Sequence, residues 1–485
     1  MSDDIKTKAA HGVLWSFVER FGQQGIQFII SIILARLLTP KEFGLIGMLI
    51  IFTAIAQAFL DSGFGSALIQ KKDATHVDEC SIFYFNIIVG FATVALLYLI
   101  SPLIAAFYGE PQLVSLTRFL SLNLIINSFA LIQITLLKKK VDFKSQLKVG
   151  ITATIISGGI GILLALYGFG VWSLAIQLVS SSILKVMLLW RLGNWRPALQ
   201  FSYDSLKSMF TFGSRMLFSG LLDQIFMNIY LVVIGKLFTV GDLGYYVRAQ
   251  SWQQLTTRNI TSVVTRVAFP VFSSIQDDNA RLKRGMKKAL SFLAFVNFPL
   301  MIGILVTARP IVLLLLTEKW AASIPYLQLL CLVGLMYPAH SINLNLLMAK
   351  GRSDLFFRLE LIKKTFIIIS ILVTYRWGIQ AMIWGQIAVS MIGLYINTFF
   401  TARMIDYPIM EQLRDITPYL FATVLMGTIV YSLKYVPFGS TFSLFLMQCI
   451  VGIVVYYRLC KGLRLSAFME IRDYAVRKFS FLQFA

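Results

Sequence analysis

Arginine side chains inside apolar segments are the residues of this sequence best suited to binding chemistry. Arg248, Arg258 and Arg266 lie in one segment, 243–270, with no acidic residue between the first and the last. Arg248 and Arg266 are eighteen residues apart, which corresponds to about 27 Å of helix and is close to the thickness of a bilayer core. Guanidinium groups stay charged and bind phosphate through paired hydrogen bonds. The segment therefore predicts a hydrated path for an anionic, phosphate-bearing substrate.

The alternative is that Arg248 and Arg266 reach the two headgroup zones, which leaves Arg258 as the single deep charge. Polar side chains that flank this arginine on the same segment would contact sugar hydroxyls, and the first segment, 13–38, carries a similar stripe with Gln23 and Gln27 one turn apart. Such a stripe lines water or hydrogen-bonds a neighbouring helix. The candidate substrate-binding residues are Arg20, Gln23, Gln27, Arg215, Arg248, Gln253, Gln254, Arg258 and Asn259.

Three acidic residues inside apolar segments are candidates for ion coupling. They are Glu19, Asp61 and Asp223. A carboxylate inside a membrane is costly and often carries a proton or binds a sodium ion during transport. Pairing of each carboxylate with a nearby arginine is an equally good interpretation.

Metal, thiol and nucleophilic chemistry have no support in the sequence. The four cysteines form no C-x-x-C motif, and the three histidines have no ligand spacing. No H-E-x-x-H, G-x-S-x-G or phosphate-binding loop motif occurs either. We therefore expect a protein that is not an enzyme and that has no metal and no cofactor. The glycine-rich stretch 157–161 is attributed to helix packing.

The elements that must position these residues are membrane-spanning helices. The chain has 485 residues, of which 57% are hydrophobic and 14% charged, and its mean hydropathy is +0.75. Apolar runs long enough to cross a bilayer recur along it, and only helices satisfy the backbone of such runs in lipid. We predict an all-α polytopic membrane protein of about fourteen spans. They are 13–38, 43–69, 79–105, 113–137, 146–167, 171–191, 205–235, 243–270, 285–316, 324–349, 357–375, 379–403, 415–433 and 440–460.

Basic residues predict the orientation of these spans. Of the 44 lysines and arginines, 30 fall in the two ends of the chain and in alternate loops. The positive-inside rule therefore makes both termini cytoplasmic. The net charge of +21 indicates attraction to anionic lipids. We expect no nucleic-acid partner, because no soluble basic module is present.

A repeat divides the chain into two related halves. Ala35–Gly44 resembles Gly235–Gly244, which lies two hundred residues later, and both join two apolar segments. Six spans per half would make parallel repeats around a central cavity, an architecture of alternating-access carriers. The predicted domains are 1–195, 196–405 and 406–485, the last with two extra helices. Its basic end, from Arg464, is expected to be an amphipathic helix on the inner membrane surface, or else a disordered or partner-binding tail.

Several short motifs connect the chain to a known family. Leu37–Gly44 and Asp61–Lys71, followed by Phe269–Ser273 and Lys319–Trp320, resemble the Wzx-type polysaccharide flippases of the multidrug/oligosaccharidyl-lipid/polysaccharide (MOP) superfamily, most of all exporters of colanic-acid and teichuronic-acid type. The resemblance covers about residues 10–405. It implies export of undecaprenyl-pyrophosphate-linked oligosaccharides across the bacterial cytoplasmic (inner) membrane, for exopolysaccharide, capsule or lipopolysaccharide O-antigen. A coupling ion, H⁺ or Na⁺, and a polysaccharide polymerase are the further partners that it suggests.

Three other functions remain open at this stage. An ion-coupled multidrug exporter of the same superfamily would need acids in its cavity, whereas arginines outnumber acids here. A lipid II flippase is a near relative with a similar substrate. A membrane glycosyltransferase or polymer ligase would need a sizeable outer loop, and the predicted outer loops are short.

Overall fold

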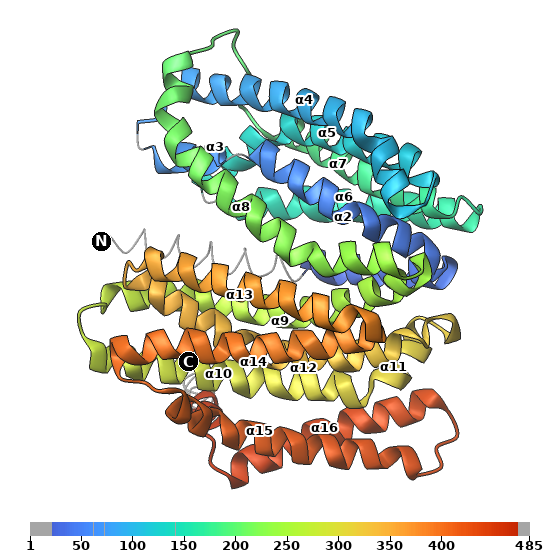
Figure 1. The fold of residues 1–485 in the computed structure, drawn as a ribbon, viewed down its shortest axis with the longest axis vertical. Helices are drawn as coiled ribbons and strands as arrows, with labels where there is room; N and C mark the ends of the chain where they lie inside the picture. The colour runs from blue at the N-terminus through green and yellow to red at the C-terminus, as the bar shows by residue number, and fades with distance from the viewer. Residues whose placement is uncertain (1–21, 62, 72, 141, 474–485) are drawn as a thin grey trace, which may run out of the picture. The chain divides into compact units, whose positions relative to one another are not determined.

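The computed structural model describes residues 22–61, 63–71, 73–140 and 142–473. These residues form helices joined by short turns, and no strand occurs among them (Figure 1). Contacts divide the chain into two compact units, residues 1–244 and 245–485. The described part of the first unit begins with a helix at 22–37 and continues with α2 (Pro40–Asp61), α3 (Phe64–Gln70), α4 (His76–Tyr108), α5 (Gln112–Lys139), α6 (Phe143–Leu166), α7 (Val171–Leu192) and α8 (Tyr203–Leu237).

The second unit takes most of α9 and all later elements. They are α9 (Val240–Ser274), α10 (Asn279–Val306), α11 (Ala308–Leu315), the short 3₁₀ helix η1 (Glu318–Trp320), α12 (Ser323–Ala349), α13 (Ser353–Thr374), η2 (Tyr375–Trp377), α14 (Gly378–Ile405), α15 (Ile409–Ser432), η3 (Leu433–Tyr435) and α16 (Thr441–Gly462).

The predicted all-α membrane fold is confirmed. Eleven helical stretches in the described residues are long and apolar enough to cross a bilayer. Three predicted spans account for the difference from fourteen. The first begins before the described residues, α9 is too polar to be counted by hydropathy, and α13 and α14 form one apolar stretch, Asp354–Ile405. The number fourteen stays a prediction.

Within the first unit, helices pack as long antiparallel pairs. In Figure 1, α4 runs beside α5, and α8 crosses α2. α8 is the first long helix of the second sequence repeat, yet it contacts α2, α3 and α4. The division predicted from the sequence, at residues 195 and 405, stays a prediction.

The second unit holds its C-terminal helices through charges at one end. Lys283 of α10 lies 2.6 Å from Glu411 of α15, and Lys287 lies 2.8 Å from Asp415. The described beginning of the basic tail, 466–473, is helical, and its Phe468 is buried beside Phe295. The rest of the predicted amphipathic tail, from 474 onward, lies outside the described residues.

The two repeated turns have the same hydrogen bonds. Thr39 donates through its backbone N–H and its hydroxyl to the Glu42 carboxylate. Thr239 donates in the same way to Asp242, over 3.3 and 2.7 Å. An acid in the first turn of a helix also interacts favourably with the helix dipole. The local sequence repeat is therefore also a structural repeat.

The same turns approach each other closely at the beginning of α2 and α9. A Cβ atom built on Gly44 would lie 1.8 Å from the carbonyl oxygen of Val240. One built on Gly244 would lie 1.9 Å from the carbonyl oxygen of Pro40. Gly44 and Gly244 correspond in the repeat, and so do Pro40 and Val240, so the contact is reciprocal. Only glycine fits at these two positions.

Candidate functional site

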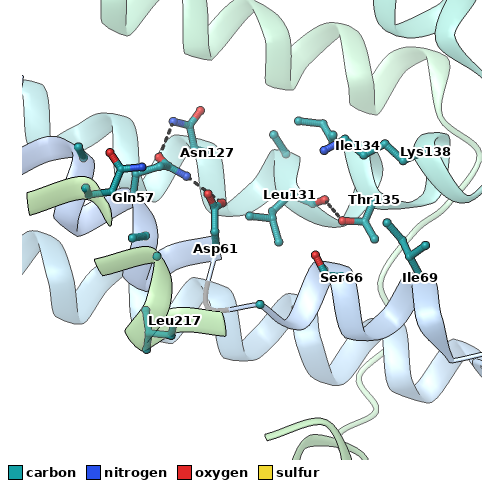
Figure 2. A pocket seen from close by; sticks show the side chains of 17 residues that line it. Gln57, Asp61, Ser66, Ile69, Asn127, Leu131, Ile134, Thr135, Lys138 and Leu217 are labelled. Atoms are coloured by element: carbon teal, nitrogen blue, oxygen red, sulfur yellow. Dashed lines mark hydrogen bonds between the residues drawn. The ribbon is translucent and has the colours of Figure 1, made fainter. Parts of the chain in front are cut away.

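The candidate site is a polar pocket of about 640 Å³ in the first unit (Figure 2). α2, α3, α5 and α8 supply its walls. Figure 2 shows a chain of hydrogen bonds along it, in which Asn127 Nδ2 donates to Gln57 Oε1 over 3.4 Å and Gln57 Nε2 donates to Asp61 Oδ1 over 3.1 Å. Lys138 also lines the pocket. The pocket therefore offers one carboxylate, one ammonium group and several amide groups.

The sequence places these groups by simple helix geometry. Gln57 and Asp61 are four residues apart on α2, so they share a face. After Asp61 the chain turns sharply through Gly63, whose φ of 72° is left-handed. Gly65 then approaches the Thr135 hydroxyl of α5, which a Cβ would meet at 3.1 Å. The turn thus holds α3 close to α5, and both helices line the same pocket as Asp61.

A second pocket of about 470 Å³ adjoins the first and shares Gln57 and Asn127 with it. Its other walls come from the helix at 22–37, α6 and α7. Gln23 and Gln27 both line it, and Gln23 Nε2 donates to the Thr154 hydroxyl over 3.4 Å. The structure therefore brings two predicted site residues into one pocket. Their contact with a substrate stays a prediction.

Glycines of α6 let its neighbours approach this second pocket. A Cβ on Gly150 would meet Gln23 Oε1 at 2.7 Å, and one on Gly158 would meet the Ile30 side chain at 2.2 Å. On the other side, a Cβ on Gly161 would lie 3.0 Å from Gln177 Cβ of α7. The stretch 157–161 is thus a helix-packing element, as its sequence predicts.

The arginines of α9 differ in their surroundings. Arg248 is only 5% exposed, and its guanidinium lies 5.4 Å from the centroid of the buried Trp320 ring. Arg258 and Arg266 are exposed. The predicted ladder of three arginines therefore divides into one arginine packed on an aromatic ring and two accessible ones. Phosphate binding by these residues stays a prediction.

Two of the other predicted residues of α9 make local hydrogen bonds. Gln253 is buried and donates through Nε2 to the Thr257 hydroxyl over 3.0 Å. Asn259 donates to the carbonyl oxygen of Leu255 one turn earlier, and Gln254 is half-buried.

Several predicted residues lie beyond what the structure describes. Glu19 and Arg20 precede residue 22, and the side chain of Arg215, on α8, is not described. Asp223 is half-buried on α8, and its neighbour Gln224 lines the first pocket. Of the three ion-coupling candidates, Asp61 is the one that lines either pocket among the described residues.

Many polar residues of the two pockets were not predicted as site residues. Among them are Gln57, Asn127, Lys138 and Lys185. One signal was available, since Gln57 stands four residues before Asp61 and Asn127 four residues after Asn123, which puts two polar groups on one face of each helix. That both faces meet is a property of the packing alone.

The chain is similar in sequence to a family of known proteins. Residues 33–325 match the family described as "Polysaccharide biosynthesis protein". The teichuronic acid biosynthesis protein TuaB of Bacillus subtilis is 30% identical over 89% of this chain and 90% of its own length. The lipopolysaccharide biosynthesis protein WzxC of Escherichia coli is 28% identical over 76% and 75%.

Among solved structures, the lipid II flippase MurJ in an inward closed conformation superposes with a TM-score of 0.77. It covers 93% of this chain and 98% of its own, at 16% sequence identity. That likeness concerns the fold. Sequence and fold agree with the resemblance to polysaccharide flippases of the MOP superfamily. The chain belongs to the polysaccharide biosynthesis protein family.

Proposed function

We propose that the protein is a flippase that moves undecaprenyl-pyrophosphate-linked oligosaccharides from the cytoplasmic to the outer leaflet of the bacterial cytoplasmic membrane. The observation that carries the proposal is the pair of adjoining polar pockets among helices apolar enough to cross a bilayer. Polar side chains on membrane-spanning helices are costly unless they bind a ligand, pair with one another or line a hydrated path for a substrate. Amides and hydroxyls match the hydroxyls of a sugar, and the family is one of polysaccharide biosynthesis.

The substrate would be held by two kinds of side chain. Arginines hold the pyrophosphate through paired hydrogen bonds, and amides contact the sugars. Gln23 and Gln27 have the strongest support, because both line the second pocket. The full set is Arg20, Arg215, Arg248 and Arg258 for the pyrophosphate and Gln23, Gln27, Gln253, Gln254 and Asn259 for the sugars.

Transport would proceed by alternating access of the two halves. Asp61 is the best-supported site of coupling to a proton or sodium ion, because its carboxylate lines the first pocket and accepts a hydrogen bond from Gln57. Glu19 and Asp223 are the other candidates. No step needs a catalytic group, so the protein would act as a transporter and supply substrate to a polysaccharide polymerase.

The orientation that we propose has both termini in the cytoplasm. The bases that support it include Lys283 and Lys287, which are paired with acids at one end of the second unit. Basic residues left on the cytoplasmic side would also attract anionic lipids.

The test is a flipping assay in proteoliposomes. Purified protein is reconstituted with a fluorescent undecaprenyl-pyrophosphate disaccharide, and the fraction protected from an impermeant quencher is followed over time. The wild-type protein should move the probe faster than protein-free vesicles do. Loss of one hydrogen bond to the substrate costs about 1 kcal/mol, so Gln27→Leu should slow transport roughly fivefold or more.

Gln448→Leu is the matched control, because Gln448 is an amide of α16 that lines neither pocket and hydrogen-bonds only the Val430 carbonyl among the described residues. An equal loss in both variants would indicate general damage and not substrate contact. Wild-type vesicles that do no better than protein-free ones would reject the flippase. Drug-resistance profiles of a deletion strain separate it from a multidrug exporter.

A further inference from the structure

The second pocket has a lysine among neutral side chains. Of the described residues that line it, Lys185 of α7 is the only ionisable one. Within the described part of the chain, Lys185 makes no ion pair and no hydrogen bond. A half-buried ammonium group in such a pocket is stabilised by an anionic partner. We propose that Lys185 binds a carboxylate on a sugar ring, which makes the second pocket a subsite for an acidic sugar. This inference rests on the proposed function.

Helix geometry puts Lys185 at the end of a polar face. Gln177, Ser181 and Lys185 follow one another at steps of four along α7 and all line the pocket. The helix at 22–37 contributes Gln23 and Gln27 to the same pocket, again four residues apart. The lysine thus stands among neutral groups that both donate and accept hydrogen bonds.

The charge of the lining favours a sugar carboxylate over the pyrophosphate. A pyrophosphate carries more than one negative charge, and the single lysine would leave the excess unmatched. The neutral amides and hydroxyls around the lysine match the hydroxyls of a sugar, which both donate and accept hydrogen bonds.

The pocket has suitable dimensions and chemistry for one sugar unit. Its volume of about 470 Å³ falls within the usual range for small-ligand sites. Leucine and isoleucine side chains complete the lining. They can pack on the apolar C–H face of a sugar ring, while the amides bind its hydroxyls. Lysine is a point charge, which suits one carboxylate.

The experiment measures binding of two probes to the purified full-length protein in nanodiscs. Both are undecaprenyl-pyrophosphate disaccharides, and they differ only in the terminal sugar, glucuronic acid in one and glucose in the other. The wild-type protein should bind the acidic probe about tenfold more tightly, the size expected for one charge-assisted hydrogen bond. Lys185→Gln should remove this preference and leave the affinity for the glucose probe unchanged. Lys185→Arg should retain most of it.

Three results would overturn the proposal. Equal affinity of the wild-type protein for the two probes would show that the protein does not recognise the carboxylate of the sugar. Weaker binding of both probes by Lys185→Gln would assign the lysine to the shared pyrophosphate. A preference for the acidic probe that appears in Glu19→Gln and is absent from the wild type would indicate that the lysine serves as the partner of Glu19, which precedes the described residues. Failure of the flipping assay in proteoliposomes, with the preference intact, would reject the transport function and leave the subsite standing.

Discussion

Substitution of Gly44 by alanine should force apart the contact between the beginnings of α2 and α9. The new Cβ atom would lie 1.8 Å from the Val240 carbonyl oxygen and 2.8 Å from the Val240 carbonyl carbon. Ordinary contact between such atoms needs about 3.5 Å, so the two helix ends must separate by roughly 1.5 Å. The obstructing atoms belong to the backbone and cannot rotate away as a side chain would.

The expected magnitude follows from the cost of overpacking. Forcing an extra methyl group into a tight contact costs about 1 to 3 kcal/mol. We expect this contact to be made in one conformation of the transport cycle and broken in another. The population of the conformation that makes the contact should then fall about five- to 150-fold. Gly244→Ala should act alike, because its Cβ would lie 1.9 Å from the Pro40 carbonyl oxygen.

Thiol labelling measures the opening directly. Leu243 is fully buried beside this contact, so a cysteine there, in a chain whose native cysteines are replaced by serine, reports exposure. Gly44→Ala should raise the rate at which an impermeant maleimide modifies Leu243→Cys, and it should slow flipping. The control is Gly159→Ala, because a Cβ at Gly159 meets no atom within 4 Å.

The two glycines also predict a non-additive result. One separation of the helix ends relieves both clashes, so the double variant Gly44→Ala, Gly244→Ala should cost less than the sum of the single variants. Unchanged labelling in Gly44→Ala, with normal thermal stability and normal flipping, would refute the reasoning, since the contact would then have no part in the cycle. Additive costs would show that the two contacts open separately.

Three further predictions use the same proteoliposomes. Asp61→Asn keeps the hydrogen bond from Gln57 Nε2 but removes the charge, so flipping should no longer respond to an imposed proton or sodium gradient; a normal response would exclude Asp61 as the coupling site. Arg258→Ala should reduce flipping at least tenfold, because a charge-assisted contact to phosphate contributes about 1.5 to 3 kcal/mol, whereas full activity would contradict a role for this exposed arginine. A cross-link between cysteines placed at Lys41 and Asp242, in the two repeated turns, should arrest flipping until it is reduced, and undiminished flipping by the cross-linked protein would mean that the turns need not separate.

Local and compositional properties could be predicted from the sequence. Hydropathy predicted an all-α membrane fold because long apolar runs have one stable solution in lipid. The repeated turns were predictable because Thr39 and Glu42, like Thr239 and Asp242, stand three residues apart and form a local cap. The family resemblance was confirmed for the same reason, since it rests on contiguous motifs. That Gln23 and Gln27 lie together was predictable because they share a face of one helix; their role as site residues stays a prediction.

The tertiary structure alone decided which polar residues share a pocket. Asn127 meets Gln57 across seventy residues of chain, and Gln23 meets Thr154 across 131. Lys185 stands near the end of the predicted span 171–191, and the sequence alone does not distinguish a side chain that extends to the headgroups from one that lines a pocket. In the structure α7 packs against α6, and Lys185 lines the second pocket with the amides. The close contact of Gly44 and Gly244 was likewise invisible, because a glycine in a sequence does not tell which backbone approaches it. Helix periodicity determines which side chains share a face, but which faces meet depends on the packing of helices far apart in the chain.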